Sequence, residues 1–100
     1  MRILVASNST SKRTDYFIKA GRSLGADTCF VTYDELSAVL PDCRDTVVKL
    51  EPPVFREADF RKYNLLCEEY RSLLSRLADT DKSESVHFLN EPAAILCALD

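Results

Sequence analysis

Polar side chains gather directly after the first apolar run of the chain. The stretch "SNSTSKRT" (7–14) follows "ILVA" and brings together five hydroxyl groups, one amide and two cations. The start of a helix offers unpaired backbone N–H groups and a partial positive charge to an anion, and Lys12 and Arg13 add to that charge. A hydroxyl of residues 9–11 could equally serve as an ordinary helix cap. The stretch therefore fits an anion-binding loop and a helix start, and the two roles are compatible.

Three further apolar runs end in polar turns, at residues 32–34, 51–53 and 90–92. In an open parallel sheet, ligands bind in the crevice outside the carboxyl ends of the strands. We expect these turns and the first loop to meet at that edge. The candidate substrate-binding residues are Ser7, Asn8, Ser9, Thr10, Tyr33, Asn90 and Glu91.

The sequence contains no complete catalytic, nucleotide or metal motif. Its two glycines, Gly21 and Gly25, form neither G-x-G-x-x-G nor a P-loop, which need glycine where backbone approaches phosphate. The single histidine, His87, has no serine or cysteine partner at a spacing that indicates nucleophilic catalysis. The four cysteines form no C-x-x-C pair, and we expect buried thiols in a reducing compartment. We predict no catalytic residue, bound cofactor or metal ligand in these 100 residues.

The apolar pattern alternates between strands and helices. Short apolar runs predict strands at 2–6, 28–32, 46–50 and 86–90, and spacings of three and four predict helices at 11–24 and 34–40, over about 20 residues from Phe60, and from 91 onward. In the long helix, Tyr63 and Tyr70 lie on the apolar stripe and are expected in the core. The order predicts an α/β fold, a Rossmann-like three-layer open sheet, mostly parallel, of about four strands with helices on both faces.

Composition excludes several classes of partner. Thirteen basic and 16 acidic residues give a net charge of −3, so no basic field indicates nucleic acid or an anionic membrane. No stretch approaches the ~20 apolar residues that span a bilayer, and the N-terminus does not read as a secretory signal. We expect a cytoplasmic protein.

The final stretch "SVHFLNEPAAILCALD" (85–100) resembles the junction at which the N-terminal domain of ATP-grasp ligases passes into the central ATP-binding lobes. In that superfamily a strand ends in Asn, a Pro follows shortly, and the next helix commonly carries a "DK" pair, where this chain has Asp100. The opening "MRILVASNSTSKRTDYFIKAGRSLGADTCFVTYDEL" (1–36) is similar to the family's first strand, polar loop, helix and second strand. The resemblance covers the whole chain.

The resemblance implies a pre-ATP-grasp domain at 1–90 and, at 91–100, the start of a helix that leads into ATP-binding lobes of the same chain. Such ligases activate a carboxylate with ATP and Mg²⁺ and join it to an amine or a thiol. ATP, Mg²⁺ and catalysis would belong to the later lobes, so residues 1–100 alone are expected to be inactive. The domain would contact a small carboxylate-bearing substrate or a peptide end, with Ser7–Thr10 as the first loop and Asn90 and Glu91 as the junction, and would also carry a surface for a homodimer.

Two other readings of the sequence stay open. The hydroxyl-rich loop after the first strand also resembles, faintly, the phosphate loop of flavodoxins, which predicts a small flavin- or nucleotide-binding module. The third reading is an interaction domain that binds no ligand, in which the polar turns serve only to cap helices.

Overall fold

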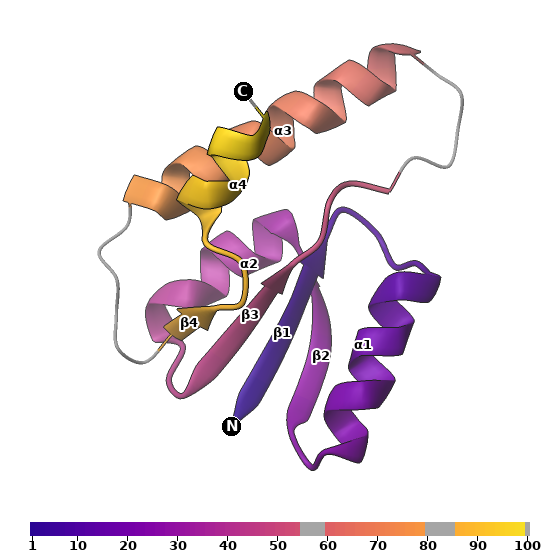
Figure 1. Cartoon of the computed structure of the whole chain (residues 1–100), viewed down its shortest axis with the longest axis vertical. Helices are drawn as coiled ribbons and strands as arrows, with labels where there is room; N and C mark the ends of the chain where they lie inside the picture. Colours follow the sequence, from indigo (N-terminus) through magenta and orange to yellow (C-terminus); the bar gives the residue numbers. More distant parts are fainter. Residues whose placement is uncertain (55–59, 80–85, 100) are drawn as a thin grey trace.

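The computed structural model describes residues 1–54, 60–79 and 86–99 and has strands and helices in alternation (Figure 1). The strands are β1 (Arg2–Ser7), β2 (Asp27–Thr32), β3 (Thr46–Leu50) and β4 (Val86–Phe88). The helices are α1 (Lys12–Ser23), α2 (Tyr33–Val39), α3 (Phe60–Asp79) and α4 (Pro92–Leu99), with a 3-10 turn η1 (Leu40–Asp42) after α2. Every element predicted from the sequence is present, with ends that differ by at most two residues.

The strands form one sheet in the order β2-β1-β3-β4, and every neighbouring pair is parallel. The connection from β1 leads to one edge of the sheet, and the connection from β3 leads to the other. A crevice opens at such a switch point because the two loops diverge there. The predicted α/β class is therefore confirmed, and the switch point, where we expect ligands to bind, lies between the carboxyl ends of β1 and β3.

Different helices cover the two faces of the sheet. In β1, Leu4 and Ala6 belong to the core cluster that also contains Leu36 of α2 and Leu73 of α3. Val5 lies between them in sequence, is equally buried and points to the opposite face. Helix α1 packs there against β1 and β2, apart from α2, α3 and α4 (Figure 1). The predicted three layers are confirmed.

Helix α1 begins with a capping box, as its sequence allows. The Ser11 side chain accepts a hydrogen bond from the Thr14 N–H at 3.2 Å, and Thr14 Oγ1 accepts one from the Ser11 N–H at 2.7 Å. The apolar spacing that predicts the helix at 11–24 includes Leu24, but this side chain is 86% exposed. Gly21 is buried in its place, because α1 lies so close to β2 that a side chain would not fit.

Three other local expectations are corrected by the structure. Helix α2 begins at Tyr33, one residue before the predicted 34–40, and is capped by Thr32, which accepts a hydrogen bond from the Glu35 N–H. In α3, Tyr70 lies in the core as expected, but Tyr63 is 46% exposed, because the buried side chains gather in the second half of the helix. Strand β4 ends at Phe88, so Asn90 lies beyond the ladder in a bend.

The cysteines and helices add two further observations. Cys29, Cys43, Cys67 and Cys97 are free thiols, and Cys97 is exposed, not buried as expected. None of the helices in the described residues has the length and apolar character that crossing a bilayer requires.

Gly21→Ala tests the close approach of α1 to β2. The added Cβ would lie 2.2 Å from Thr28 Oγ1, so we expect the free energy of unfolding in urea to fall by about 1–3 kcal/mol. In a Thr28→Ala background the loss should be smaller, because the closest atom is gone. An equal loss in both backgrounds would contradict this packing.

Candidate functional site

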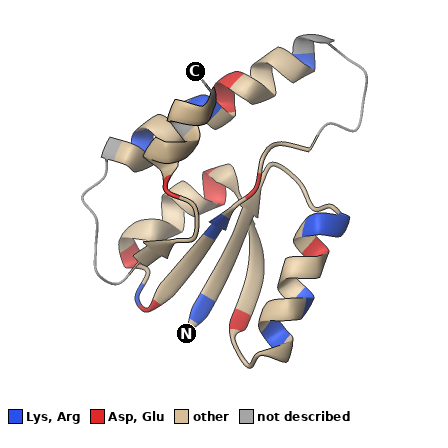
Figure 2. Cartoon of the chain, in the orientation of Figure 1, with Lys and Arg blue, Asp and Glu red and all other residues tan. Residues whose placement is uncertain are grey.

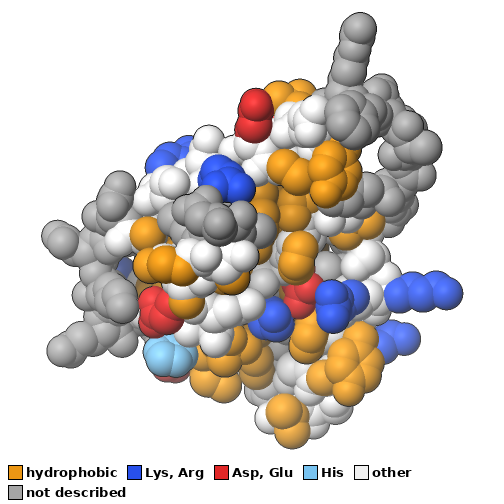
Figure 3. Space-filling model, turned by 45° about the horizontal axis from the view of Figure 1, so that its top comes forward, with side chains coloured by type: hydrophobic (Ala, Val, Ile, Leu, Met, Phe, Trp, Pro, Cys, Tyr) orange, Lys and Arg blue, Asp and Glu red, His pale blue; other side chains and the backbone are white. Residues whose placement is uncertain are grey.

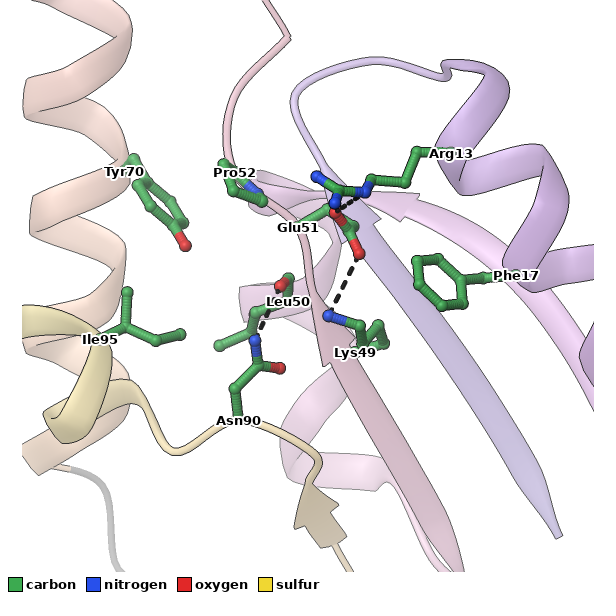
Figure 4. A pocket seen from close by; sticks show the side chains of 9 residues that line it. All are labelled: Arg13, Phe17, Lys49, Leu50, Glu51, Pro52, Tyr70, Asn90 and Ile95. Atoms are coloured by element: carbon green, nitrogen blue, oxygen red, sulfur yellow. Dashed lines mark hydrogen bonds and ion pairs between the residues drawn. The ribbon is translucent and has the colours of Figure 1, made fainter. Parts of the chain in front are cut away.

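A hollow of about 290 Å³ opens at the end of β3, close to the smallest volumes typical of small-molecule sites, ~300 Å³. The residues that line it come from α1, β3, α3, α4 and the turns between them: Arg13, Phe17, Lys49, Leu50, Glu51, Pro52, Tyr70, Asn90 and Ile95 (Figure 4). The hollow therefore lies on the carboxyl-end side of the sheet, where the strand order predicts a crevice.

Glu51 is the acidic residue among those that line the hollow. It is 4% exposed, and its carboxylate lies 3.1 Å from Lys49 Nζ and 3.8 Å from Arg13 Nε. Lys49 reaches it because residues two apart in a strand point to the same face. Burying a carboxylate is unfavourable unless cations pair with it, and these two residues supply that pairing.

Arg13, Lys49 and Glu51 together carry a net charge of +1, since two cations pair with one carboxylate. Figure 2 shows the basic positions at the start of α1 and the end of β3, on either side of the acidic position that follows β3. With the carboxyl ends of the strands turned toward the viewer, Figure 3 shows basic side chains beside an acidic one, next to apolar side chains. The hollow thus combines a local positive charge with an apolar wall.

Phe17 helps to hold Lys49 in place. Lys49 Nζ lies 5.2 Å from the centre of the Phe17 ring, within the range of a cation–π contact. The Lys49 side chain is 21% exposed, so its ammonium group faces both Glu51 and the space of the hollow. Arg13 is different, because its side chain is 72% exposed and lies on the rim.

Asn8 fastens the loop after β1 to the segment after β3. Its Oδ1 accepts a hydrogen bond from the Val54 N–H at 2.7 Å, and its Nδ2 donates to the Val54 carbonyl at 3.1 Å. Ser7 is fully buried, and its hydroxyl lies 3.2 Å from the Pro52 carbonyl and 3.2 Å from Asn8 Oδ1. The side chains of the predicted first loop therefore hold the wall of the hollow.

Two stacked tyrosines lie beside the turn that follows β3. The rings of Tyr33 and Tyr70 lie 5.4 Å apart at 26°, and the Tyr33 hydroxyl donates to the Glu51 carbonyl at 2.5 Å. Burial raises the pKa of both phenols above the usual value, and the nearby Glu51 carboxylate raises each further, while a hydrogen bond with Ser7 opposes the shift at Tyr33. Both phenols are therefore protonated at neutral pH and can donate hydrogen bonds.

Asn90 lines the hollow and has one unsatisfied acceptor. Its Nδ2 donates to the Leu50 carbonyl at 3.4 Å, whereas its Oδ1 is buried and has no partner among the described residues. Reversing the amide would turn Oδ1 toward the Leu50 carbonyl, so the donor at Nδ2 sets the orientation. A buried oxygen without a donor lowers stability by about 1–3 kcal/mol.

The seven candidate residues have different places in this geometry. Asn90 lines the hollow, and Ser7, Asn8 and Tyr33 hold its walls. Ser9, Thr10 and Glu91 are not among its lining residues. Ser9 donates to the Thr10 carbonyl at 3.2 Å, and the Glu91 carbonyl accepts from the Ile95 N–H at 3.1 Å in the first turn of α4.

Sequence reasoning missed the charged centre of the site. Lys49 and Glu51 were not candidates, and Arg13 was noted only as a cation at a helix start. The signal was present in "VVKLE" (47–51), because a lysine at an inward position of a buried strand, followed two residues later by an acid, indicates a buried ion pair at the strand end.

Within the described residues, no group of three or more His, Cys, Asp or Glu side chains could hold a metal ion. In the comparisons with known proteins, no family model, no curated protein and no solved structure matches the chain. The function must therefore be argued from the geometry.

Asn8→Ala tests whether this side chain holds the loop. Losing both hydrogen bonds to Val54 should reduce the free energy of unfolding by about 1–3 kcal/mol in urea. Ser9→Ala is the matched control, because its exposed hydroxyl bonds only locally, and it should stay within about 0.5 kcal/mol. Equal stability of the two variants would show that Asn8 does not fasten the two loops.

The raised pKa of Tyr33 predicts that the protein loses stability at alkaline pH. Its pKa is raised in the folded state, so its contribution is fully present below pH 10 and is lost as the pH rises from there toward the folded pKa. Tyr33→Phe should therefore flatten the fall of unfolding free energy above pH 10, by up to about 1.4 kcal/mol per pH unit.

Tyr16→Phe is the control for this measurement, because Tyr16 is 68% exposed. It should keep the pH profile of the unchanged protein. If Tyr16→Phe flattened the profile and Tyr33→Phe did not, the assignment of the alkaline transition to the buried phenol would be wrong.

Proposed function

We propose that this chain is the substrate-side domain of an ATP-dependent carboxylate–amine or carboxylate–thiol ligase of the ATP-grasp type. In this proposal the hollow binds a small carboxylate-bearing substrate or a peptide end. The observation that carries it is the position of a net positive, partly apolar hollow at the switch point of the sheet. Ligands of open α/β sheets bind at this place, and a net positive charge favours an anion.

The Asn90–Pro92 junction supports the same proposal. Its similarity to the family suggested a passage from one lobe to the next, and Asn90 and Ile95 both line the hollow. The residues that lead into α4 therefore belong to the site. A lobe that follows α4 in such a ligase would begin next to the bound carboxylate.

The described residues do not fit ATP or Mg²⁺. The loop after β1 has no glycine, its Ser7 and Asn8 side chains bond within the protein, and the described residues offer no cluster of metal-binding side chains. In an ATP-grasp ligase, ATP and Mg²⁺ activate the carboxylate. We assign that step to other parts of the protein, and we assign binding of the carboxylate to Arg13, with Lys49 paired to Glu51 beside it.

A flavin-binding module is a second candidate, favoured by the order β2-β1-β3-β4, which flavodoxin-like sheets share. It predicts a yellow protein with the absorbance of a flavin. The internal hydrogen bonds of Ser7 and Asn8 favour the first proposal, because they occupy the loop that would hold the flavin phosphate.

Thermal unfolding with added ligands tests the proposal. A small carboxylate at about ten times its Kd should raise Tm by roughly 6–11 °C, and Mg-ATP alone should leave Tm unchanged. Arg13→Gln should abolish the carboxylate effect, while Lys19→Gln, an exposed change elsewhere on α1, should keep it. A rise in Tm with Mg-ATP would contradict the proposal. So would the absence of any rise in Tm with a panel of aliphatic and acylamino acids.

A further inference from the structure

We infer that the hollow selects a monocarboxylate with an apolar tail and disfavours a dicarboxylate of the same length. This inference rests on the proposed function, because it names the class of carboxylate that the site takes. Three observations carry it: the net charge of +1 on Arg13, Lys49 and Glu51, the apolar side chains on the far side of the hollow, and the buried Tyr70 among them.

Glu51 limits the hollow to one further negative charge. Its carboxylate lies 3.1 Å from Lys49 Nζ and therefore compensates the charge of that ammonium group. Arg13 Nε is 3.8 Å from the same carboxylate, longer than a hydrogen bond, and its side chain is largely exposed on the rim (Figure 4). A guanidinium group can hold a carboxylate through two parallel N–H bonds. One ligand carboxylate at Arg13 therefore balances the net charge of the three residues, and a second would exceed it.

The far side of the hollow is apolar. Tyr70 and Ile95 stand there, opposite Arg13 and Phe17 (Figure 4). Besides Arg13 and Lys49, the described residues that line the hollow include no cation. A methylene chain that runs from Arg13 toward Ile95 is removed from water along this wall, and each buried methylene favours binding.

The surroundings of Tyr70 show what a second negative charge would meet on this side. Burial raises the pKa of the Tyr70 phenol, and the Glu51 carboxylate raises it further, because both oppose the charged phenolate. A ligand carboxylate beside Tyr70 would likewise lose hydration and meet the charge of Glu51, without a lining cation on that side to compensate. A methyl group in the same place has neither cost.

The size of the hollow limits the length of the tail. Its volume of about 290 Å³ has room for roughly ten groups of the size of a water molecule, at ~30 Å³ each. Short aliphatic acids such as hexanoate are of this size. N-acetyl-L-leucine belongs to the same class, because it joins one carboxylate to an aliphatic side chain.

Three matched ligands test the inference on the unchanged protein by calorimetry or ligand-observed NMR. Hexanoate has one carboxylate and an apolar tail, adipate ends the same carbon chain in a second carboxylate, and butanoate has a shorter tail. We expect hexanoate to bind about tenfold more tightly than adipate, because the second charge of adipate would lie on the apolar side. It should also bind about tenfold more tightly than butanoate, because each buried methylene tightens binding by up to about fourfold.

The outcomes separate this inference from the proposed function. Adipate that binds as tightly as hexanoate, or more tightly, would overturn the inference and leave the proposed function standing. Equal binding of butanoate and hexanoate would do the same, because the tail would then lie outside the hollow. Failure of every carboxylate to bind would overturn the proposed function as well.

Glu51→Gln and Ile95→Lys are the matched variants, and circular dichroism verifies their folds. The first removes the acidic charge beside Arg13 and Lys49, and the second adds a cation on the apolar side, at a half-buried position. Each should bring the affinity for adipate to within about threefold of that for hexanoate.

Lys19→Gln, an exposed change elsewhere on α1, is the control and should keep the preference for hexanoate. Because Glu51 is buried and paired, Ile95→Lys decides the test if Glu51→Gln does not fold. A preference for hexanoate that stays at about tenfold in the folded variants would overturn the inference.

Discussion

The structure around the crevice depends on the burial of the Glu51 carboxylate at the end of β3. Every polar group of this residue has a partner: its N–H donates to the Ala6 carbonyl at 2.9 Å, its carbonyl accepts from Tyr33, and its carboxylate pairs with Lys49 and Arg13. A buried acid without these partners would be strongly unfavourable. One residue thus joins β1, α1 and α2 at the point where the ladder between β1 and β3 ends.

The hollow follows from that junction. Because β1 and β3 connect to opposite edges of the sheet, their loops diverge. Two hydrogen bonds between Asn8 and Val54 hold the segment after β3 to the loop after β1. The tyrosine pair supports the floor from the side of α2 and α3. The site is therefore built on strand ends and helix faces, with a fixed floor and an exposed cation at the rim, a suitable arrangement for orienting a small ligand.

Much of the fold could be predicted from the sequence, because apolar periodicity and turn residues act locally. The runs at 2–6 and 46–50 and the long helix were correct for this reason. The exposed Leu24 and Tyr63 were missed, because periodicity gives a helix face without saying how far the neighbouring layer extends along it.

The candidate site was predicted only in part. Asn90 could be found, since it lies at the end of the apolar run that predicts the last strand. The ion pairs of Glu51 depend on the register of β1 and β3 and on the side of the sheet that α1 covers, and neither is visible in a local pattern. The stretch "SNSTSKRT" (7–14) contains both a local contact that could be predicted and a distant one that could not. Ser11 caps α1 as expected, while Asn8 bonds to a segment 46 residues away.

NMR mapping of a bound carboxylate shows whether the hollow around Glu51 is the binding site. In ¹H–¹⁵N spectra of the chain titrated with N-acetyl-L-leucine, we expect the largest shifts at the backbone amide of Glu51, the side-chain amide of Asn90 and the Nε–H of Arg13. Shifts confined to β2 and the exposed side of α3, with none at these three groups, would contradict it.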